Sequence, residues 1–184
     1  MELQAALQRI HLSSPDPLLA ARFYSSTYGM VPEPADDGYL CCGPGRQVHL
    51  FSGSANQLKY AIFALHSVSA WAAFATRVQD LKHQSLPTKF AGSDSAIALQ
   101  DPDDNLLIFT PLDSGEAPAI QTQFPPATLQ PFTLRSPQLP AVLDFYTGQL
   151  GFVLSDIVKD EHDLRACFFA PTRGIGEAEC TGEH

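Results

Sequence analysis

Two stretches that repeat one order of elements decide the fold of this chain. Residues 10–16 read IHLSSPD, and the helical stretch that follows them ends at residues 23–30 as FYSSTYGM. Residues 132–138 read FTLRSPQ and lead to residues 145–152, which read FYTGQLGF. Both copies give a strand, a Ser-Pro break, an amphipathic helix and a Phe-Tyr pair shortly before a glycine. A long unit that recurs in this way predicts a fold built from repeated modules.

The first copy belongs to a unit of the form β-α-β-β-(β). Apolar and polar residues alternate through residues 7–12, with Leu7, Arg9 and His11 on the face opposite Ile10 and Leu12, which predicts a half-buried strand. The Ser-Ser-Pro-Asp sequence of residues 13–16 supplies N-cap chemistry for a helix that stops at Gly29. Two further strands are expected over residues 39–42 and 46–51.

Two more units follow along the chain. The second has a strand over 59–65, a helix over 68–82, and strands near 89–91, 95–100 and 105–110. The third has a strand over 132–135, a helix over 138–149, and strands over 152–158 and 163–170. A stretch rich in Pro, Gln and Thr separates the second unit from the third and marks a domain boundary.

Composition excludes several classes of function. The chain has 184 residues, 45% of them hydrophobic, which is enough for a substantial core. A net charge of -9 with only 11 scattered basic residues argues against a nucleic-acid partner. The absence of a signal-like N-terminus and of long apolar runs predicts a cytoplasmic protein without membrane spans. The four cysteines lack metal-binding spacing and are expected to be reduced, mostly buried thiols.

Three motifs then give the chain a resemblance to a known superfamily. Residues 101–109, DPDDNLLIF, are similar to the D-P-D-G-N-x-x-E-F turn and last strand of the vicinal-oxygen-chelate superfamily. Residues 57–61, QLKYA, resemble the entry to the second module of its extradiol dioxygenases, and residues 145–156, FYTGQLGFVLSD, resemble the opening of their third module. The superfamily also contains glyoxalase I and the bleomycin-resistance proteins, and the resemblance covers the chain up to residue 170.

The resemblance implies an α+β fold in which paired βαβββ modules form a cup-shaped mixed sheet with helices outside. We therefore expect paired modules over residues 1–112, the first at 5–55 and the second at 57–112. A linker over 113–128, a partial third module over 129–170 and a disordered tail over 171–184 complete this division. Extradiol dioxygenases of this type have four modules, so the chain resembles their N-terminal part and reads as truncated.

The same resemblance locates where metal ligands would stand. Members that cleave catechols hold Fe(II) with two His and one carboxylate in modules three and four, and the equivalent position in the third module here is Pro131. In the first two modules the equivalent positions are Arg9, about Leu50, Tyr60 and Ile108. None of these residues forms a credible metal set, so we expect no catalytic residues, no metal site and no cofactor in this chain.

A metal site at His11 and His49 is an alternative that needs a further assumption. His49 precedes Leu50 and should point away from the face of His11, unless a bulge shifts the register. A carboxylate ligand would also be needed. The other histidines, at 66, 83, 162 and 184, are expected to be surface residues.

Arg9, His11 and Tyr60 are the candidate ligand-binding residues, because we expect them to line the cup between modules one and two. The alternative is that bulky side chains fill the cup, with Leu50 and Ile108 as apolar plugs.

Three functions stay open at this point. The first is an extradiol-dioxygenase-like protein that is non-catalytic by itself. The second is a metal-free module that binds a small aromatic or hydrophobic molecule, as resistance-type members do. The third is an interaction scaffold, in which self-association or a partner chain covers the sheet edge and apolar helix of the incomplete third module. The sequence identifies neither the ligand nor the oligomeric state.

Overall fold

The computed structural model describes residues 2–35, 37–55, 57–81, 95–111, 135–161 and 163–172. The linker over 113–128, the expected strands near 89–91 and at 132–134, Pro131 and the tail from 173 onward lie outside these ranges. Within them, none of the helices combines the length and apolar composition that a membrane span needs. The described cysteines, Cys41, Cys42 and Cys167, are free thiols.

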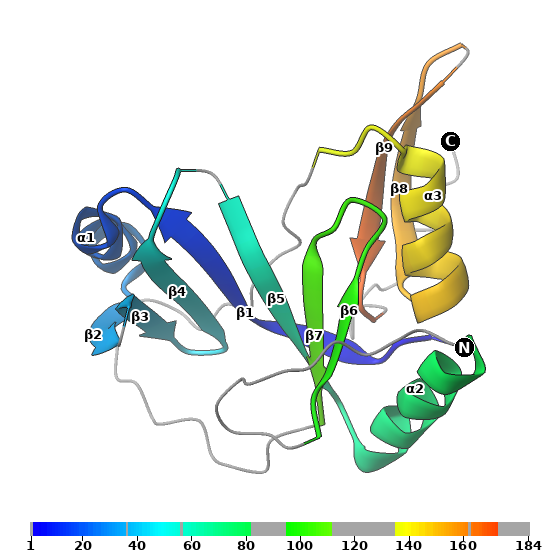
Figure 1. The fold of residues 1–184 in the computed structure, drawn as a ribbon, viewed down its shortest axis with the longest axis horizontal. Coiled ribbons are helices and arrows are strands. Elements are labelled where there is room, and N and C mark those ends of the chain that lie inside the picture. Colours follow the sequence, from blue (N-terminus) through cyan, green and yellow to red (C-terminus); the bar gives the residue numbers. More distant parts are fainter. Residues whose placement is uncertain are drawn as a thin grey trace, which may run out of the picture.

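The first two units together form one sheet of seven strands (Figure 1). The first unit contributes β1 (Ala5–Ser14), α1 (Pro17–Tyr28), β2 (Val31–Ala35), β3 (Gly38–Gly43) and β4 (Arg46–Ser52). The second contributes β5 (Gln57–Leu65), α2 (Val68–Asp80), β6 (Ile97–Gln100) and β7 (Leu106–Thr110). The strand order is β2-β3-β4-β1-β5-β7-β6, with β1 parallel to β4 and antiparallel to β5. This is the mixed sheet of paired modules that the sequence predicted.

Helix α1 begins and ends at the residues that the sequence indicated. Asp16 is the N-cap, and its side chain accepts a hydrogen bond of 2.9 Å from the backbone N–H of Leu19. Pro17 opens the first turn, where its missing N–H costs nothing. Gly29 closes the helix in the left-handed conformation, with φ of 64°, which favours glycine.

Both helices of the paired modules cover the same face of the sheet. Helix α1 packs Ala21 against Val48 and Leu50 of β4, while α2 packs Phe74 and Val78 into a larger cluster over β5 and β7. Ile10 of β1 packs against both clusters, so the two lie on one side of the sheet. We call the other side the helix-free face.

The third unit packs against the first two (Figure 1). It consists of α3 (Leu139–Leu143), the π-helix η1 (Asp144–Leu150), β8 (Val153–Lys159) and β9 (Leu164–Ala170), the two strands forming a separate antiparallel sheet. The sequence predicted one α-helix over 138–149, and the structure widens its second half into π-helical turns. Backbone hydrogen bonds join this unit to the N-terminal segment, and in one of them Leu3 N–H donates to the Gly151 carbonyl at 2.8 Å.

The expectation of an exposed apolar helix in this unit was wrong. Val142, Phe145, Tyr146 and Leu150 are all buried, in the same cluster as Phe74 of α2. The helix buries its apolar side against the paired modules because this removes about 25 cal/mol of unfavourable exposure for each Å². The exposed apolar side chains of the unit lie instead on β8 and β9.

Candidate ligand-binding face

Arg9, His11 and Tyr60 lie together on the helix-free face, as the sequence predicted. Ile10 and Leu12 pack on the side of α1, so the residues between and before them point the other way. Tyr60 of β5 is the direct partner of His11 in the antiparallel pairing. Three candidate side chains from two adjacent strands therefore share one surface.

A β-bulge at Gln8 puts Arg9 on this face. Leu7 pairs with Phe63 and lies in the helix-side core, yet Arg9, two residues later, pairs with the very next residue of β5, Ile62. The extra residue in β1 reverses the alternation of side chains. Odd-numbered residues before the bulge therefore face the helix side, and odd-numbered residues after it face the helix-free side. Without the bulge, Arg9 and Leu7 would point the same way.

His49 lies on the helix-free face too, and the prediction that it points to the opposite side was wrong. In the parallel pairing of β1 with β4, His11 stands opposite His49, and Leu12 stands opposite Leu50. The superfamily resemblance had predicted Leu50 at the position opposite His11, which is one residue too far along β4. Leu50 is instead buried under α1, whereas Ile108, buried and paired with Ile62, does stand on the helix-free face as an apolar residue.

The two imidazoles contact each other through one nitrogen each. His11 Nδ1 and His49 Nδ1 are 3.0 Å apart, so one must donate and the other accept. Asp37 Oδ1 lies 3.1 Å from His49 Nε2, and its charge favours the tautomer of His49 with the proton on Nε2. In that tautomer His49 Nδ1 accepts from His11 Nδ1–H, which leaves His11 Nε2 as a bare acceptor.

That acceptor is buried and has no hydrogen-bond partner. His11 is 3% exposed, and its Nε2 is one of two buried side-chain polar atoms without a hydrogen-bond partner in the described part of the chain. The other is His49 Nε2, which lies within ion-pair distance of Asp37 but makes no hydrogen bond of good geometry with it. Burial, followed by the nearby His49 and Arg9, lowers the pKa of His11 to about 3, so the ring is neutral at physiological pH. A neutral imidazole with an unsatisfied acceptor can take a proton donor from a ligand.

Tyr60 and Arg9 flank this imidazole. The Tyr60 ring stacks on His11 with centroids 3.7 Å apart and planes 26° from parallel. Arg9 Nε donates to Gln47 Oε1 at 2.6 Å, and burial lowers the pKa of the Arg9 guanidinium. Burial also raises the pKa of Tyr60, which keeps its hydroxyl protonated. This face therefore carries an aromatic stack and a cation, and the neutral acceptor of His11 is buried beside them.

These residues do not fit a ferrous site of the two-His, one-carboxylate kind. Such a site needs three protein donors that converge on one ion and leave positions open for substrate. Two imidazole nitrogens do converge here, but Asp37 contacts the far side of the His49 ring, at Nε2. Within the described ranges no group of three or more His, Cys, Asp or Glu side chains is placed to hold a metal. His66 is exposed at the end of β5, and the remaining histidines lie outside the described residues.

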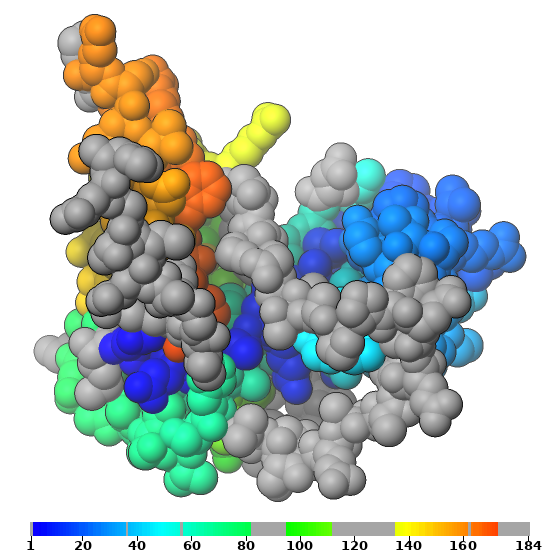
Figure 2. Space-filling view, turned by 180° about the vertical axis from the view of Figure 1, so that it is seen from behind, coloured from blue at the N-terminus to red at the C-terminus, as the bar shows by residue number. Residues whose placement is uncertain are grey.

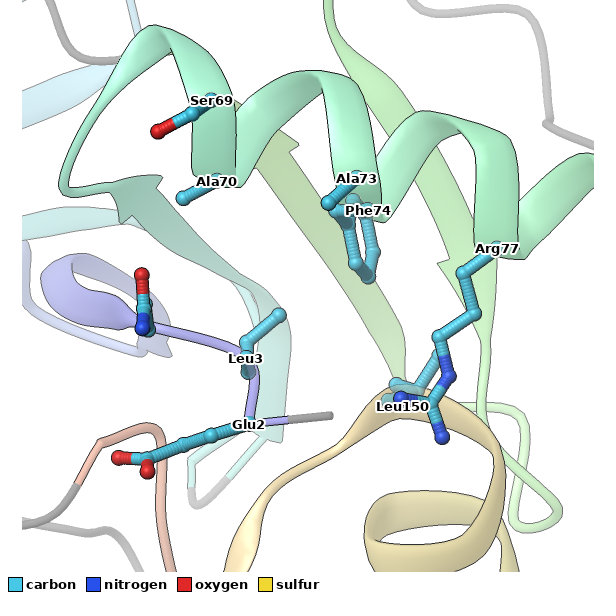
Figure 3. Close-up of a pocket in the computed structure, with 9 residues that line it drawn as sticks. Glu2, Leu3, Ser69, Ala70, Ala73, Phe74, Arg77 and Leu150 are labelled. Carbon is cyan, nitrogen blue, oxygen red and sulfur yellow. The ribbon is translucent and has the colours of Figure 1, made fainter.

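A cavity of about 200 Å³ lies elsewhere, on the helix side (Figure 3). It opens between the N-terminal segment, α2 and the end of η1, and Figure 3 shows Glu2 and Arg77 on either side of an apolar floor that includes Leu3, Phe74 and Leu150. None of Arg9, His11 or Tyr60 lines it. Its floor consists of ordinary core side chains. The buried His11 Nε2, which has no hydrogen-bond partner, lies on the helix-free face instead, which makes that face the better candidate site.

Comparison with known proteins gives matches at the level of structure. No protein-family model matches the chain, and neither does any curated protein sequence. Among solved structures, BphC, a halotolerant catechol dioxygenase, matches with a TM-score of 0.70 and 16% identity over 89% of this chain and 60% of that chain. The Mn(II)-bound glyoxalase from Novosphingobium aromaticivorans matches with a TM-score of 0.66 and 19% identity over 92% of this chain and 58% of that chain.

A catechol 2,3-dioxygenase matches with a TM-score of 0.63 and 16% identity, over 94% of this chain and 64% of that chain. The chain thus spans about 60% of the length of these neighbours. Identities this low establish the fold and not the activity. The fold of this chain is therefore the fold that these catechol dioxygenases and this glyoxalase share.

Proposed function

We propose that this chain is a dioxygenase-like module that binds a small aromatic molecule on its helix-free face and does not cleave it. The observation that carries the proposal is the stack of His11 on Tyr60, beside Arg9, with His11 Nε2 unsatisfied. The likeness in fold to catechol dioxygenases supports an aromatic ligand. The lack of a third converging donor among the described residues supports binding without iron chemistry.

The binding chemistry follows from the unmet acceptor. A buried polar atom without a partner costs about 1–3 kcal/mol. A phenolic hydroxyl that donates to His11 Nε2 would remove this cost, and a ligand ring near Arg9 would gain a cation–π attraction. An aromatic hydrocarbon of the same size would gain only the apolar part. Phenols should therefore bind more tightly than toluene.

A titration of phenol and toluene against matched variants tests the proposal. His11→Asn keeps a donor toward His49 Nδ1 and removes the Nε2 acceptor, whereas His66→Asn alters an exposed histidine outside the face. Calorimetry should show about tenfold weaker phenol binding to His11→Asn and unchanged binding to His66→Asn. No preference for phenol over toluene in the wild-type chain would contradict the proposal. Catechol ring cleavage by the Fe(II)-supplied chain would overturn its non-catalytic part.

A second candidate function is self-association through the β8–β9 hairpin. Phe168 and Val158 are each 45% exposed and lie on the same face of this hairpin. Figure 2 shows the orange part of the hairpin projecting beyond the body of the molecule, where a second copy could reach it. Exposed apolar side chains grouped in this way favour a protein partner, and the oligomeric state of a Phe168 variant tests it.

A further inference from the structure

Arg9 has no anionic partner among the described residues. Its Nε donates a hydrogen bond to Gln47, and neither terminal nitrogen of the guanidinium donates to an acceptor within the described ranges. Ion pairs between described residues join His49 to Asp37 and Arg165 to Asp160 and Asp163, and Arg9 takes part in none of these three. A half-buried cation that stays unpaired is costly, because burial removes water without supplying a counter-charge.

The row of the sheet that contains Arg9 is uncharged on both sides of it. Across the paired strands this row consists of Val31, Cys42, Gln47, Arg9, Ile62, Ile108 and Ala98. Glu33 on the edge strand β2 pairs opposite Leu40, in the row of His11, three strand spacings or about 14 Å from β1. Asp37 is engaged at His49. Of the acidic side chains that the structure describes on this face, none is therefore placed to neutralise Arg9.

Arg9 and the unmet acceptor of His11 are two residues apart on one strand face. Residues with this spacing are separated by about 7 Å along the strand. This backbone spacing places the two side chains close enough for one benzene ring with a hydroxyl and a carboxylate to contact both. A guanidinium matches a carboxylate because its parallel N–H groups can donate to both carboxylate oxygens. A ligand with a neutral amide in place of the carboxylate has only one oxygen that accepts, and it has no charge.

From this placement we propose that the ligand of the helix-free face is an aromatic carboxylate, with its carboxylate on Arg9 and a ring hydroxyl directed to His11. This rests on the proposed function and adds the charge of the ligand. Burial lowers the pKa of Arg9, and a bound carboxylate would reverse that effect by supplying the missing negative charge. The chemical class is that of the hydroxybenzoates.

Three ligands of equal ring size separate this inference from the proposed function. They are phenol, 4-hydroxybenzamide and 4-hydroxybenzoate, of which the last two have the same shape and differ in charge. Calorimetry on the wild-type chain should show 4-hydroxybenzoate binding at least about tenfold more tightly than 4-hydroxybenzamide. Equal binding of these two would overturn the carboxylate inference and leave the proposed function standing. Failure of all three ligands to bind would overturn both.

Variants at Arg9 supply the second arm of the test. Arg9→Gln should abolish the preference for 4-hydroxybenzoate while phenol still binds, and Arg9→Lys should retain part of the preference because it keeps the charge without the paired donors. Arg22→Gln, on the exposed side of α1, is the matched control and should behave as wild type. If Arg9→Gln keeps the full preference, the carboxylate does not lie on Arg9. The comparison of ligands on the wild-type chain needs no variant to fold.

Discussion

At the scale of single residues, the hydrogen-bonding capacity of the helix-free face depends on which nitrogen of each imidazole carries no proton. The sequence placed Arg9, His11 and Tyr60 on one surface because their strand positions can be read by alternation and by the superfamily resemblance. It misplaced His49, since the register between β1 and β4 is set by their pairing within the first unit and not by either strand alone. The contact between the two imidazoles, and the unmet acceptor that results from it, could not have been predicted without that register.

The neutral state of His11 makes stability depend on pH in a defined direction. Its folded pKa of about 3 lies below the usual value of 6.5, so its contribution is complete above pH 6.5 and is lost as the pH falls toward 3. Between pH 7 and pH 5 the free energy of unfolding should fall by at most about 2 kcal/mol through this residue. Urea denaturation of His11→Asn should show a smaller fall than wild type, with His66→Asn as control. An equal fall in His11→Asn and wild type would show that His11 does not carry the effect.

At the scale of elements, the sequence predicted type and extent best where apolar periodicity was unbroken. Helix α2 was expected over 68–82 and spans Val68–Asp80. The π-helical turns of η1 and the bulge in β1 were not predictable, because each inserts a residue that no special side chain marks: Gln8 is an ordinary polar residue in a strand. Interruptions of this kind are selected by the packing on either side of them.

The β8–β9 hairpin carries its own prediction. If it mediates self-association, Phe168→Ser should shift the chain toward monomer, because Phe168 is the largest exposed apolar side chain of the hairpin. Sedimentation velocity over a series of protein concentrations measures this shift. Phe23→Ser, which changes a 53% exposed phenylalanine on α1, should leave association unchanged. A wild-type chain that stays monomeric at every concentration would rule out the second candidate function.

At the scale of the whole molecule, the Asp-Pro-Asp turn joins the third unit to the paired modules. The sequence showed residues 101–105 only as a turn. In the structure Asp101 is buried and accepts hydrogen bonds from Asn105 within its loop and, at 3.0 Å, from the hydroxyl of Tyr146. Burial and the Asp101 carboxylate raise the pKa of Tyr146, so its hydroxyl remains a donor at any ordinary pH. A long-range contact of this kind has no signature in either local sequence.

Removing this hydroxyl should loosen the attachment of the third unit. Tyr146→Phe keeps the ring in its cluster but leaves the buried Asp101 oxygen with one donor fewer, which should lower the free energy of unfolding by about 1–2 kcal/mol. Chemical denaturation measures the change, and Tyr28→Phe, at a 48% exposed position, should leave stability within about 0.5 kcal/mol of wild type. Equal stability of the two variants would mean that the contact is not formed in solution.

The bulge at Gln8 divides the central strand into two stretches with opposite tolerance for change. Before it, the odd-numbered positions Ala5 and Leu7 belong to the core and should admit only apolar side chains of similar volume. After it, the odd-numbered positions should tolerate polar side chains. The even-numbered Ile10 and Leu12 pack against the core there and should admit only apolar side chains. One inserted residue thus lets the odd-numbered positions of a single strand pack in the core along half its length and carry polar side chains on the helix-free face along the other half.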